Sequence, residues 1–351
     1  MRLSLLAAAG SLLLLPQPAF AQPADGGVRT FPLTAGQRGP AERDTAPFSL
    51  VGVSWDDPGA VFEGSVQVKV RPVGGVWGDW HPLEVEADDR PDPGGAERAG
   101  RGATAPLWVG PSDGVAVRFT GTPPRGLRAE LVDPGRASAR SLPATAHEGP
   151  RPGIVTRSGW GADESLRESG FGYTGPVRAV FVHHTDTAND YACSDAPKVI
   201  RAIYQYHVKS SGWRDIGYNF LVDRCGTVYE GRAGGVAEPV LGAHTLGFNT
   251  DTAGVAALGR YSSDTAPQAQ VDGIAKVAAW KLGLTGRDAD GSVTLTSASD
   301  GSKFKKGTSA TFRTVSGHRD AFNTECPGNA LYQRLPAIRS WSAHLQGRQG
   351  L

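Results

Sequence analysis

The sequence has few of the features that mark specialised classes of protein. Lys and Arg number 36 against 35 Asp and Glu, so the net charge is only +1 and gives no electrostatic reason to expect nucleic acid as a partner. Cysteine is scarce, with three residues in 351, and aromatic residues make up 8% of the chain. Glycine and proline are abundant instead, at 47 and 25, which favours many turns and short elements. The length allows two domains with ordinary cores.

Long hydrophobic runs are also missing, with one exception at the start of the chain. Arg2 is followed by a mostly apolar stretch from Leu3 to Leu15, and the small residues Ala19 and Ala21 follow it. A basic start, an apolar run too short to span a bilayer comfortably and this Ala-x-Ala exit predict a secretory signal peptide, residues 1–21, cleaved after Ala21. An N-terminal membrane anchor is the alternative. We expect an exported protein without stable membrane insertion.

Residues 29–133 contain short runs in which apolar and polar side chains alternate. The runs are Phe48 to Trp55, Val66 to Val70, Trp77 to Val85, Pro106 to Val109, Val115 to Phe119 and Leu127 to Val132. Short strands at this spacing predict an antiparallel β-sandwich or small jelly roll, and no cluster of titratable residues stands out in it. We predict core positions for Trp55, Trp77, Trp80 and Trp108, with stacking on sugars as the alternative. The sequence assigns this domain no role.

The pattern changes after a predicted linker at residues 134–153. Residues 154–345 mix buried strands with amphipathic helices. Strands are predicted at 177–182 and 253–258, a hairpin at 218–229, helices at 195–210, 267–282 and 330–344, and a smaller hairpin within the polar segment 285–311. Because strands and helices intermix without strict alternation, we predict an α+β domain with a mixed central β-sheet flanked by helices.

Histidine and cysteine gather in three segments of this second domain. His183 and His184 stand where a predicted buried strand ends, and His318 and Cys326 lie in glycine- and proline-containing turns further along. Zn²⁺ accepts imidazole and thiolate ligands, and a catalytic zinc site uses three protein ligands with one open position. Two histidines and one cysteine satisfy that count. The residue types alone give a weak signal, since His pairs and Cys-Pro-Gly turns also occur by chance.

Several further motifs follow one another along residues 157–339. They read Arg-Ser-Gly-Trp-Gly at 157–161, His-His-Thr at 183–185, Trp-Arg-Asp-Ile-Gly-Tyr-Asn-Phe at 213–220, Val-Tyr-Glu-Gly-Arg at 228–232, Gly-Ala-His-Thr at 242–245 and Gly-Phe-Asn at 247–249, followed by the segments around His318 and Cys326. In these motifs and their order, this part of the chain resembles the peptidoglycan recognition protein and type-2 N-acetylmuramoyl-L-alanine amidase family. The resemblance implies the family's mixed central sheet with surrounding helices.

The resemblance also implies a role for individual residues. His183, His318 and Cys326 are the expected Zn²⁺ ligands. Tyr218 and Thr324 are the expected catalytic residues, because their hydroxyls can donate hydrogen bonds to an oxyanion. The residues expected to bind substrate are His184, His207, Trp213, Arg232, His244 and Asn249. His184 has the alternative of capping its strand, and Tyr218 that of a core aromatic residue. The sequence offers no unambiguous carboxylate as a general base.

The cysteine count fits this assignment. Three cysteines in an exported chain leave one unpaired, and an exported free thiol would be open to oxidation. With Cys326 given to zinc, Cys193 and Cys225 remain as a predicted disulfide between the start of a helix and the turn of a hairpin.

These expectations combine into one function and two alternatives. We expect a secreted zinc amidase that hydrolyses the lactyl–L-Ala amide bond of peptidoglycan at the cell wall, with peptidoglycan or muropeptide as substrate and a monomer as the working form. The first alternative is a non-catalytic peptidoglycan-binding module, although such members of the family usually lack the cysteine ligand. The second is a cysteine hydrolase with Cys326 as nucleophile and His318 as base.

Overall fold

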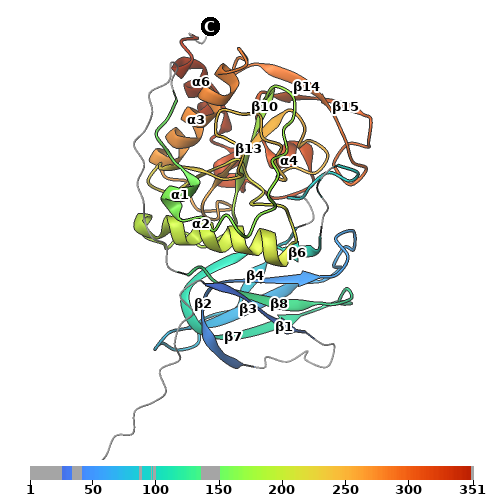
Figure 1. Cartoon of the computed structure of the whole chain (residues 1–351), viewed down its shortest axis with the longest axis vertical. Coiled ribbons are helices and arrows are strands. Elements are labelled where there is room, and N and C mark those ends of the chain that lie inside the picture. Colours follow the sequence, from blue (N-terminus) through green and yellow to red (C-terminus); the bar gives the residue numbers. More distant parts are fainter. Residues whose placement is uncertain are drawn as a thin grey trace, which may run out of the picture.

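The computed structural model describes residues 26–33, 42–86, 89–95, 97, 100–135 and 151–348. The predicted signal peptide and residues 136–150 of the predicted linker lie outside these ranges. The described chain forms an antiparallel N-terminal sheet and a C-terminal mixed sheet with helices, arranged one above the other along the long axis (Figure 1). The predicted fold class, an α+β domain preceded by an all-β domain, is confirmed. Among the described residues no helix is long and apolar enough to cross a membrane.

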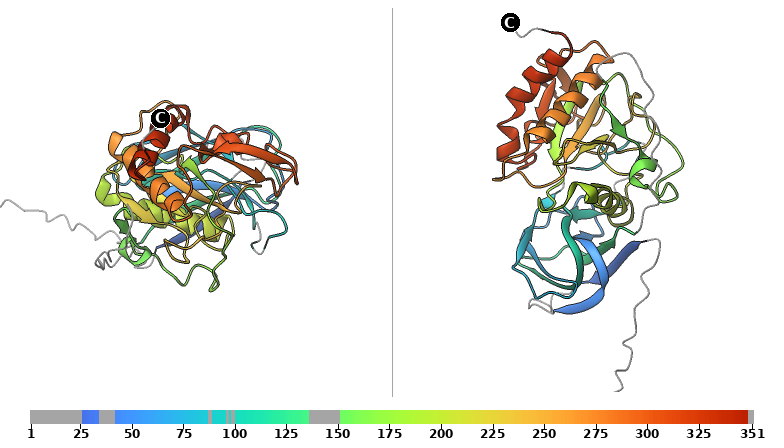
Figure 2. Two further views of the ribbon diagram at one scale, coloured as in Figure 1. Left: turned by 90° about the horizontal axis from the view of Figure 1, so that it is seen from above. Right: turned by 90° about the vertical axis from the view of Figure 1, so that its left-hand side faces the viewer.

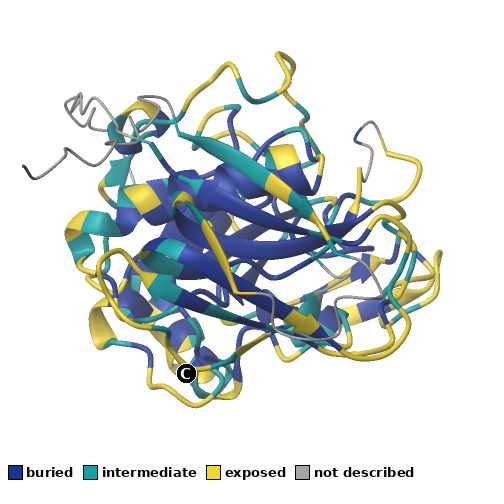
Figure 3. Cartoon of the chain, turned by 90° about the horizontal axis from the view of Figure 1, so that it is seen from below, coloured by how far each residue is buried: buried dark blue, intermediate teal, exposed yellow. Residues whose placement is uncertain are grey.

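The N-terminal sheet has eight strands in the described part of the chain. They are β1 (Gly27–Pro32), β2 (Arg43–Trp55), β3 (Val66–Pro72), β4 (His81–Leu83), β5 (Val85–Glu86), β6 (Gly102–Thr104), β7 (Leu107–Phe119) and β8 (Arg128–Asp133). The main order is β1-β8-β2-β7-β3-β4, while β5 pairs with β6 and β6 with β2. The sheet curls around an apolar interior, so its strands are largely buried while the connecting loops stay exposed (Figure 3).

Two details of this sheet differ from the prediction. The runs at 106–109 and 115–119 are not separate strands, because β7 continues through Gly110-Pro111-Ser112. The register between β2 and β7 shifts around Ser112, and such an irregularity absorbs residues that would otherwise end a strand.

The four tryptophans of this domain divide into two pairs. Trp55 and Trp108 are buried, as predicted. Trp77 and Trp80 are only half-buried and carry cationic groups over their rings, with Lys69 Nζ 5.2 Å and 5.4 Å from the two ring centroids. The prediction that Trp77 and Trp80 are core residues is therefore wrong. Cation–π contact at the surface stabilises them in place of a core.

The C-terminal sheet has the strand order β16-β10-β13-β11-β12-β9. Its strands are β9 (Ile154–Val155), β10 (Ala179–His184), β11 (Phe220–Val222), β12 (Val228–Glu230), β13 (Thr252–Ala257) and β16 (Val315–Gly317). Neighbouring strands run parallel except in the β11–β12 hairpin. A separate hairpin of β14 (Ser292–Thr296) and β15 (Ser309–Arg313) forms in the polar segment 285–311 and extends two residues beyond its predicted end.

Helices cover both faces of the C-terminal sheet (Figure 2). Helices α3 (Gln268–Gly283) and α6 (Leu335–Leu345) pack on one face, and α2 (Ala196–Gln205) packs on the other. The remaining helices α1 (Arg157–Trp160), α4 (His318–Ala321) and α5 (Asn329–Tyr332) have one turn each. A single helix was expected at 330–344, but the structure has two, α5 and α6. Pro336 lies in the first turn of α6, and because it has no amide hydrogen it cannot continue a helix from α5.

Helix α2 joins the two domains. Its side chains Val199, Ile200 and Ile203 are buried in a cluster that also contains Leu50 and Trp108 of the N-terminal sheet. The chain continues from α2 into one π-helical turn, Tyr206–Ser210. The Tyr206 hydroxyl lies within hydrogen-bonding distance of two carbonyl oxygens of the N-terminal domain, at 3.2 Å from Val53 and 3.0 Å from Thr104. The two domains therefore share a core as well as polar contacts.

A disulfide holds the start of this helical segment. Cys193, in the 3₁₀ turn Cys193–Asp195 before α2, is bonded to Cys225 in the β11–β12 turn. The predicted pairing is confirmed, and Cys326 is the cysteine that stays outside the disulfide.

Candidate metal centre and active site

The carboxyl ends of two neighbouring parallel strands bring His183 and His318 together. His183 is near the end of β10, and His318 follows the last residue of β16. The strands are in register, with Val182 opposite Gly317, so the two histidines leave the same edge of the sheet. Their ring centroids are 4.4 Å apart, and both side chains are fully buried.

Cys326 reaches the same place from the loop that follows α4. The Arg319 amide donates to the Cys326 carbonyl oxygen, 3.0 Å away, and the Cys326 amide donates to the Thr324 hydroxyl oxygen, 3.1 Å away. The Cys326 Sγ lies 3.7 Å from His183 Nδ1. One ligand atom each from His183, His318 and Cys326 falls within 4.8 Å of the others, and all three residues are buried. Two imidazoles and one thiol at these distances fit a tetrahedral zinc site with one further position.

The second ring nitrogen of His183 is held by another buried histidine. His183 Nε2 lies 3.2 Å from His244 Nδ1, which is itself 2.9 Å from the Thr245 hydroxyl. Burial, together with the nearby His183 and His318, lowers the pKa of His244 well below its ordinary value, so the ring is neutral. A partner on the far nitrogen fixes the orientation and tautomer of a metal-binding histidine. His244, which was expected to bind substrate, thus lies behind His183.

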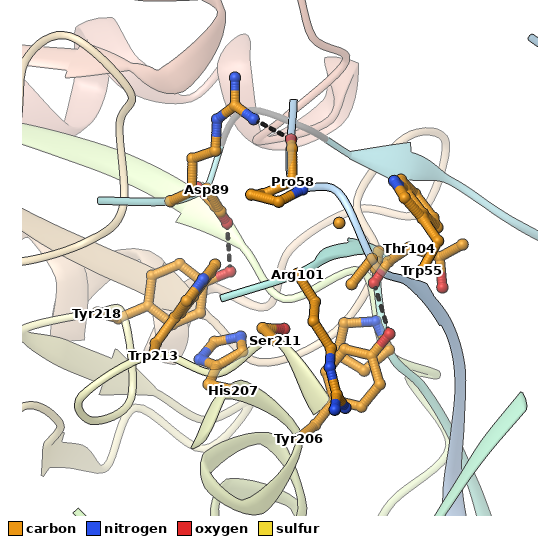
Figure 4. Close-up of a pocket in the computed structure, with 15 residues that line it drawn as sticks. Trp55, Pro58, Asp89, Arg101, Thr104, Tyr206, His207, Ser211, Trp213 and Tyr218 are labelled. Atoms are coloured by element: carbon orange, nitrogen blue, oxygen red, sulfur yellow. Dashed lines mark hydrogen bonds between the residues drawn. The ribbon is translucent and has the colours of Figure 1, made fainter. Parts of the chain in front are cut away.

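Tyr218 stands beside the cluster at the start of the β11 segment. Its ring centroid is 5.5 Å from that of His183. Its hydroxyl donates a hydrogen bond to Asp89 Oδ2, 2.6 Å away, in the N-terminal domain (Figure 4). Thr324 is half-buried and accepts the Cys326 amide, which places its hydroxyl at the turn that presents the sulfur.

His207 and Trp213 line a pocket next to Tyr218, between the two domains (Figure 4). The two rings pack with their centroids 4.4 Å apart, and His207 Nδ1 accepts the Gly217 amide at 3.1 Å. Burial and, to a lesser degree, the nearby Arg232 lower the pKa of His207 to about 3, so the ring is neutral. Both residues offer flat ring surfaces to this pocket.

His184 is directed elsewhere. Its Nδ1 accepts the Tyr261 amide at 3.2 Å, and its Nε2 lies 3.8 Å from Asp186 Oδ1. Burial lowers the pKa of His184 to about 4, with Arg260 among the smaller contributors. These contacts are those of a side chain that fixes the end of β10.

The two remaining residues expected to bind substrate contact the N-terminal domain. Arg232 forms a buried ion pair with Glu97, and Asn249 Nδ2 donates to the Arg90 carbonyl oxygen at 3.0 Å. Asp89 Oδ1 lies 3.3 Å from Nδ1 of His183 and 3.3 Å from Nδ1 of His318. Neither Asp89 nor Glu97 was predicted as a site residue, because no titratable cluster stands out in the sequence of the N-terminal domain. They lie in an acidic Pro- and Gly-containing connection, which has the composition of an ordinary surface loop.

Known proteins resemble both domains. The family model described as N-acetylmuramoyl-L-alanine amidase matches residues 173–329, and the one described as Rv3811 N-terminal galactose-binding domain-like matches residues 15–150. Peptidoglycan-recognition protein SC2 of Drosophila simulans is 30% identical over 192 residues, which cover 54% of this chain and 88% of that protein. A human N-acetylmuramoyl-L-alanine amidase is 33% identical over 169 residues, covering 47% of this chain and 24% of that protein.

A solved structure of wild-type Drosophila PGRP-LB is 27% identical and covers 52% of this chain and 92% of that chain, with a TM-score of 0.41. The segment matched by the amidase model, residues 173–329, contains His183, His318 and Cys326. The chain therefore belongs to the family of peptidoglycan-recognition proteins and N-acetylmuramoyl-L-alanine amidases.

Proposed function

We propose that the protein is an exported, zinc-dependent N-acetylmuramoyl-L-alanine amidase that hydrolyses the lactyl–L-Ala amide bond of peptidoglycan. The observation that carries the proposal is the buried cluster of His183, His318 and Cys326, whose ligand atoms lie within 4.8 Å of one another. Membership of a family that contains a human protein named for this activity supports it. The division into a signal peptide at 1–21, a β domain at 29–133, a linker at 134–153 and a catalytic domain at 154–345 belongs to the same proposal.

The three clustered residues would hold the zinc ion through His183 Nδ1, a ring nitrogen of His318 and Cys326 Sγ. A zinc ion held there supplies Lewis-acid activation of water and of the scissile carbonyl group. The surroundings suit such a site, because the far nitrogen of His183 already has a partner in His244 and the cysteine is kept out of the disulfide.

Tyr218 provides the hydrogen bond that the developing oxyanion needs. Its hydroxyl is beside the cluster, and a donor fixed in a site that excludes water stabilises the negative charge of an amide-hydrolysis transition state. Thr324 positions Cys326 through the backbone amide and offers a second hydroxyl at the same turn. His207 and Trp213 form one wall of the pocket in which the substrate would lie.

A binding-only role is the alternative, because several relatives carry the name peptidoglycan-recognition protein. The complete His183–His318–Cys326 set favours catalysis, since recognition of the polymer alone requires no cluster of buried metal-binding side chains. A simple thiol hydrolase remains distinct from both, because it would work without metal.

Digestion of purified peptidoglycan tests the proposal. We expect free stem peptides that begin at L-Ala, identified by mass analysis of the soluble products. Activity should disappear with a strong chelator and return with Zn²⁺, which a thiol hydrolase would not require. Binding of peptidoglycan without release of stem peptides, in protein with a full complement of zinc, would instead establish the binding-only role.

A further inference from the structure

A segment of the N-terminal domain enters the candidate active site. Its described residues, Asp89–Gly95 and Glu97, lie between β5 and β6 and are called the inserted segment here. It contacts the catalytic domain at several points. Asp89 reaches Tyr218, His183 and His318, the Arg90 carbonyl reaches Asn249, Asp92 Oδ1 accepts the Gly247 amide, and Glu97 pairs with Arg232.

From both histidines, the Asp89 carboxylate lies at the separation expected of a neighbouring ligand atom. Oδ1 is 3.3 Å from Nδ1 of both histidines, and the Asp89 side chain is 8% exposed. Bonds of about 2.0–2.1 Å to nitrogen or oxygen in a tetrahedral zinc site place neighbouring ligand atoms about 3.3 Å apart. The 3.7 Å between Cys326 Sγ and His183 Nδ1 likewise suits one longer bond of about 2.3 Å to sulfur.

We infer that Asp89 is the fourth protein ligand of the metal and that the inserted segment holds the active site closed. The inference rests on the proposed zinc site and adds a residue from the other domain to it. A catalytic zinc site keeps its fourth position for water or substrate. With the Asp89 carboxylate in that position, neither can enter until the segment moves away.

The rest of the segment binds the residues that were expected to bind substrate. Glu97 and Arg232 are both nearly buried and interact through two nitrogen–oxygen pairs, and Glu97 Oε1 also accepts the Arg214 amide at 3.0 Å. Asn249 donates to the Arg90 carbonyl instead of to a ligand. Substrate and inserted segment would therefore compete for Arg232, Asn249 and Tyr218.

The alternative role for Asp89 is that of a general base. A base acts through a water molecule that stands between the carboxylate and the substrate. Here the carboxylate is within 3.3 Å of both histidines and within 2.6 Å of the Tyr218 hydroxyl, so it is in direct contact with the groups that such a water would have to approach. The contacts at Arg232 and Asn249 are also those of a segment that covers the groove, which a catalytic base alone does not require.

The inserted segment has a tip that faces solvent. Pro93, Gly94 and Gly95 are exposed, and Gly94 adopts a positive φ of 80°, with no other atom within 4 Å of the place that a Cβ on it would occupy. The tip is thus accessible while Asp89 and Glu97 are anchored on either side of it. Cutting the chain at Gly94–Gly95 would uncouple the two anchors without changing any contacting side chain, so that each anchor could leave the site independently of the other.

Cobalt substitution of the full-length protein tests the ligand directly, without any substrate. Three cobalt-loaded proteins are titrated with azide and followed by visible absorption: the unmodified protein, Asp89→Ala and the control Asp79→Ala. The control removes an exposed carboxylate outside the site. We expect azide to change the spectrum of Asp89→Ala alone, and zinc affinity to fall by at least about tenfold in that variant. Equal azide binding by the unmodified protein and Asp89→Ala would overturn the inference, as would failure of the unmodified protein to bind cobalt.

Hydrolysis of a soluble muropeptide supplies a second test. Asp89→Ala, and protein cut at a protease site inserted between Gly94 and Gly95, should both hydrolyse it at least about tenfold faster than the uncut protein, because the fourth position is open. A slower reaction in Asp89→Ala with an unchanged cobalt spectrum would identify a general base and refute the inference. Absence of hydrolysis in every form, combined with azide binding only in Asp89→Ala, would remove the proposed amidase function and leave the closed metal site established.

Discussion

The C-terminal domain and the N-terminal domain reach the same site by different means. In the C-terminal domain, His183 and His318 are fixed by the register of two parallel strands, and the backbone of Arg319 fixes Cys326. The N-terminal domain contributes through one irregular segment between two short strands, held by side-chain contacts at Asp89 and Glu97. Side chains placed by strand register stay in position whether or not a ligand is bound. A loop that is held only by side-chain contacts can move out of the site.

The largest effect should come from a group that the C-terminal domain itself fixes in place. Replacing Cys326 by Ser removes the thiolate ligand, and we expect kcat/KM for muropeptide hydrolysis to fall by roughly 10³-fold or more, because the metal's contribution of several kcal/mol is lost. Zinc content, measured by elemental analysis of the dialysed protein, should fall with it. Full hydrolysis by zinc-free Cys326→Ser would refute the zinc site.

The disulfide gives a matched contrast, because it stabilises the same domain without touching the His183–His318–Cys326 cluster. Replacing both Cys193 and Cys225 by Ser opens a loop with a sequence separation of 32. The chain-entropy relation gives a loss of about 3–4 kcal/mol in the free energy of unfolding. Denaturant unfolding measures the loss, while zinc content per folded protein should stay unchanged. A fall in zinc content equal to that of Cys326→Ser would show that the two features are not independent.

Tyr218 links the two domains at the site, since its hydroxyl serves the proposed reaction and also binds Asp89 of the N-terminal domain. Tyr218→Phe should lower kcat by about 10²-fold through loss of one oxyanion donor, with little change in KM. The measurement is cleanest in the Asp89→Ala background, where the site is open before substrate arrives. If Tyr218→Phe changes only KM in that background, Tyr218 binds substrate and does not stabilise the transition state.

The difference between groups fixed by strand register and a loop held by side chains also explains what the sequence could predict. The continuous apolar run before His183 predicted a buried strand, and the 3.6-residue spacing of Val199, Ile200 and Ile203 predicted α2. Both are local patterns that reflect burial. The disulfide followed once Cys326 was assigned to the metal, and the structure contains it.

The inserted segment could not be predicted in that way. Asp89 and Glu97 meet their partners across the domain interface, and contacts between residues so far apart in the chain leave no periodicity in either segment. Acidic residues among prolines and glycines usually indicate a solvated loop. For the same reason His244 was expected to bind substrate, whereas in the structure it lies behind His183, where only the folded sheet brings the two rings together.

The position of the inserted segment depends on how firmly the domains are docked, and Gly52 tests this. A Cβ on Gly52 of β2 would lie 2.4 Å from the Tyr206 ring, so Gly52→Ala should push the two domains apart. We expect a loss of about 1–3 kcal/mol in the free energy of unfolding from this overpacking, together with faster muropeptide hydrolysis. Gly27→Ala is the matched control, since nothing lies within 4 Å of its Cβ position. If Gly52→Ala is destabilised but its rate of hydrolysis is unchanged, the docking of the two domains does not control the position of the inserted segment.

Tyr206→Phe makes the smallest change to the same interface. It removes the hydroxyl that approaches the Val53 and Thr104 carbonyl oxygens but keeps the ring packed against β2. Loss of the donor to two buried acceptors should cost about 1–3 kcal/mol, near the lower end because the ring still fills its space. Since no atom is added, the domains should stay docked, and azide should remain unable to reach cobalt in this variant. If azide does reach it, the polar contact at Tyr206, more than the apolar cluster around α2, holds the inserted segment in the site.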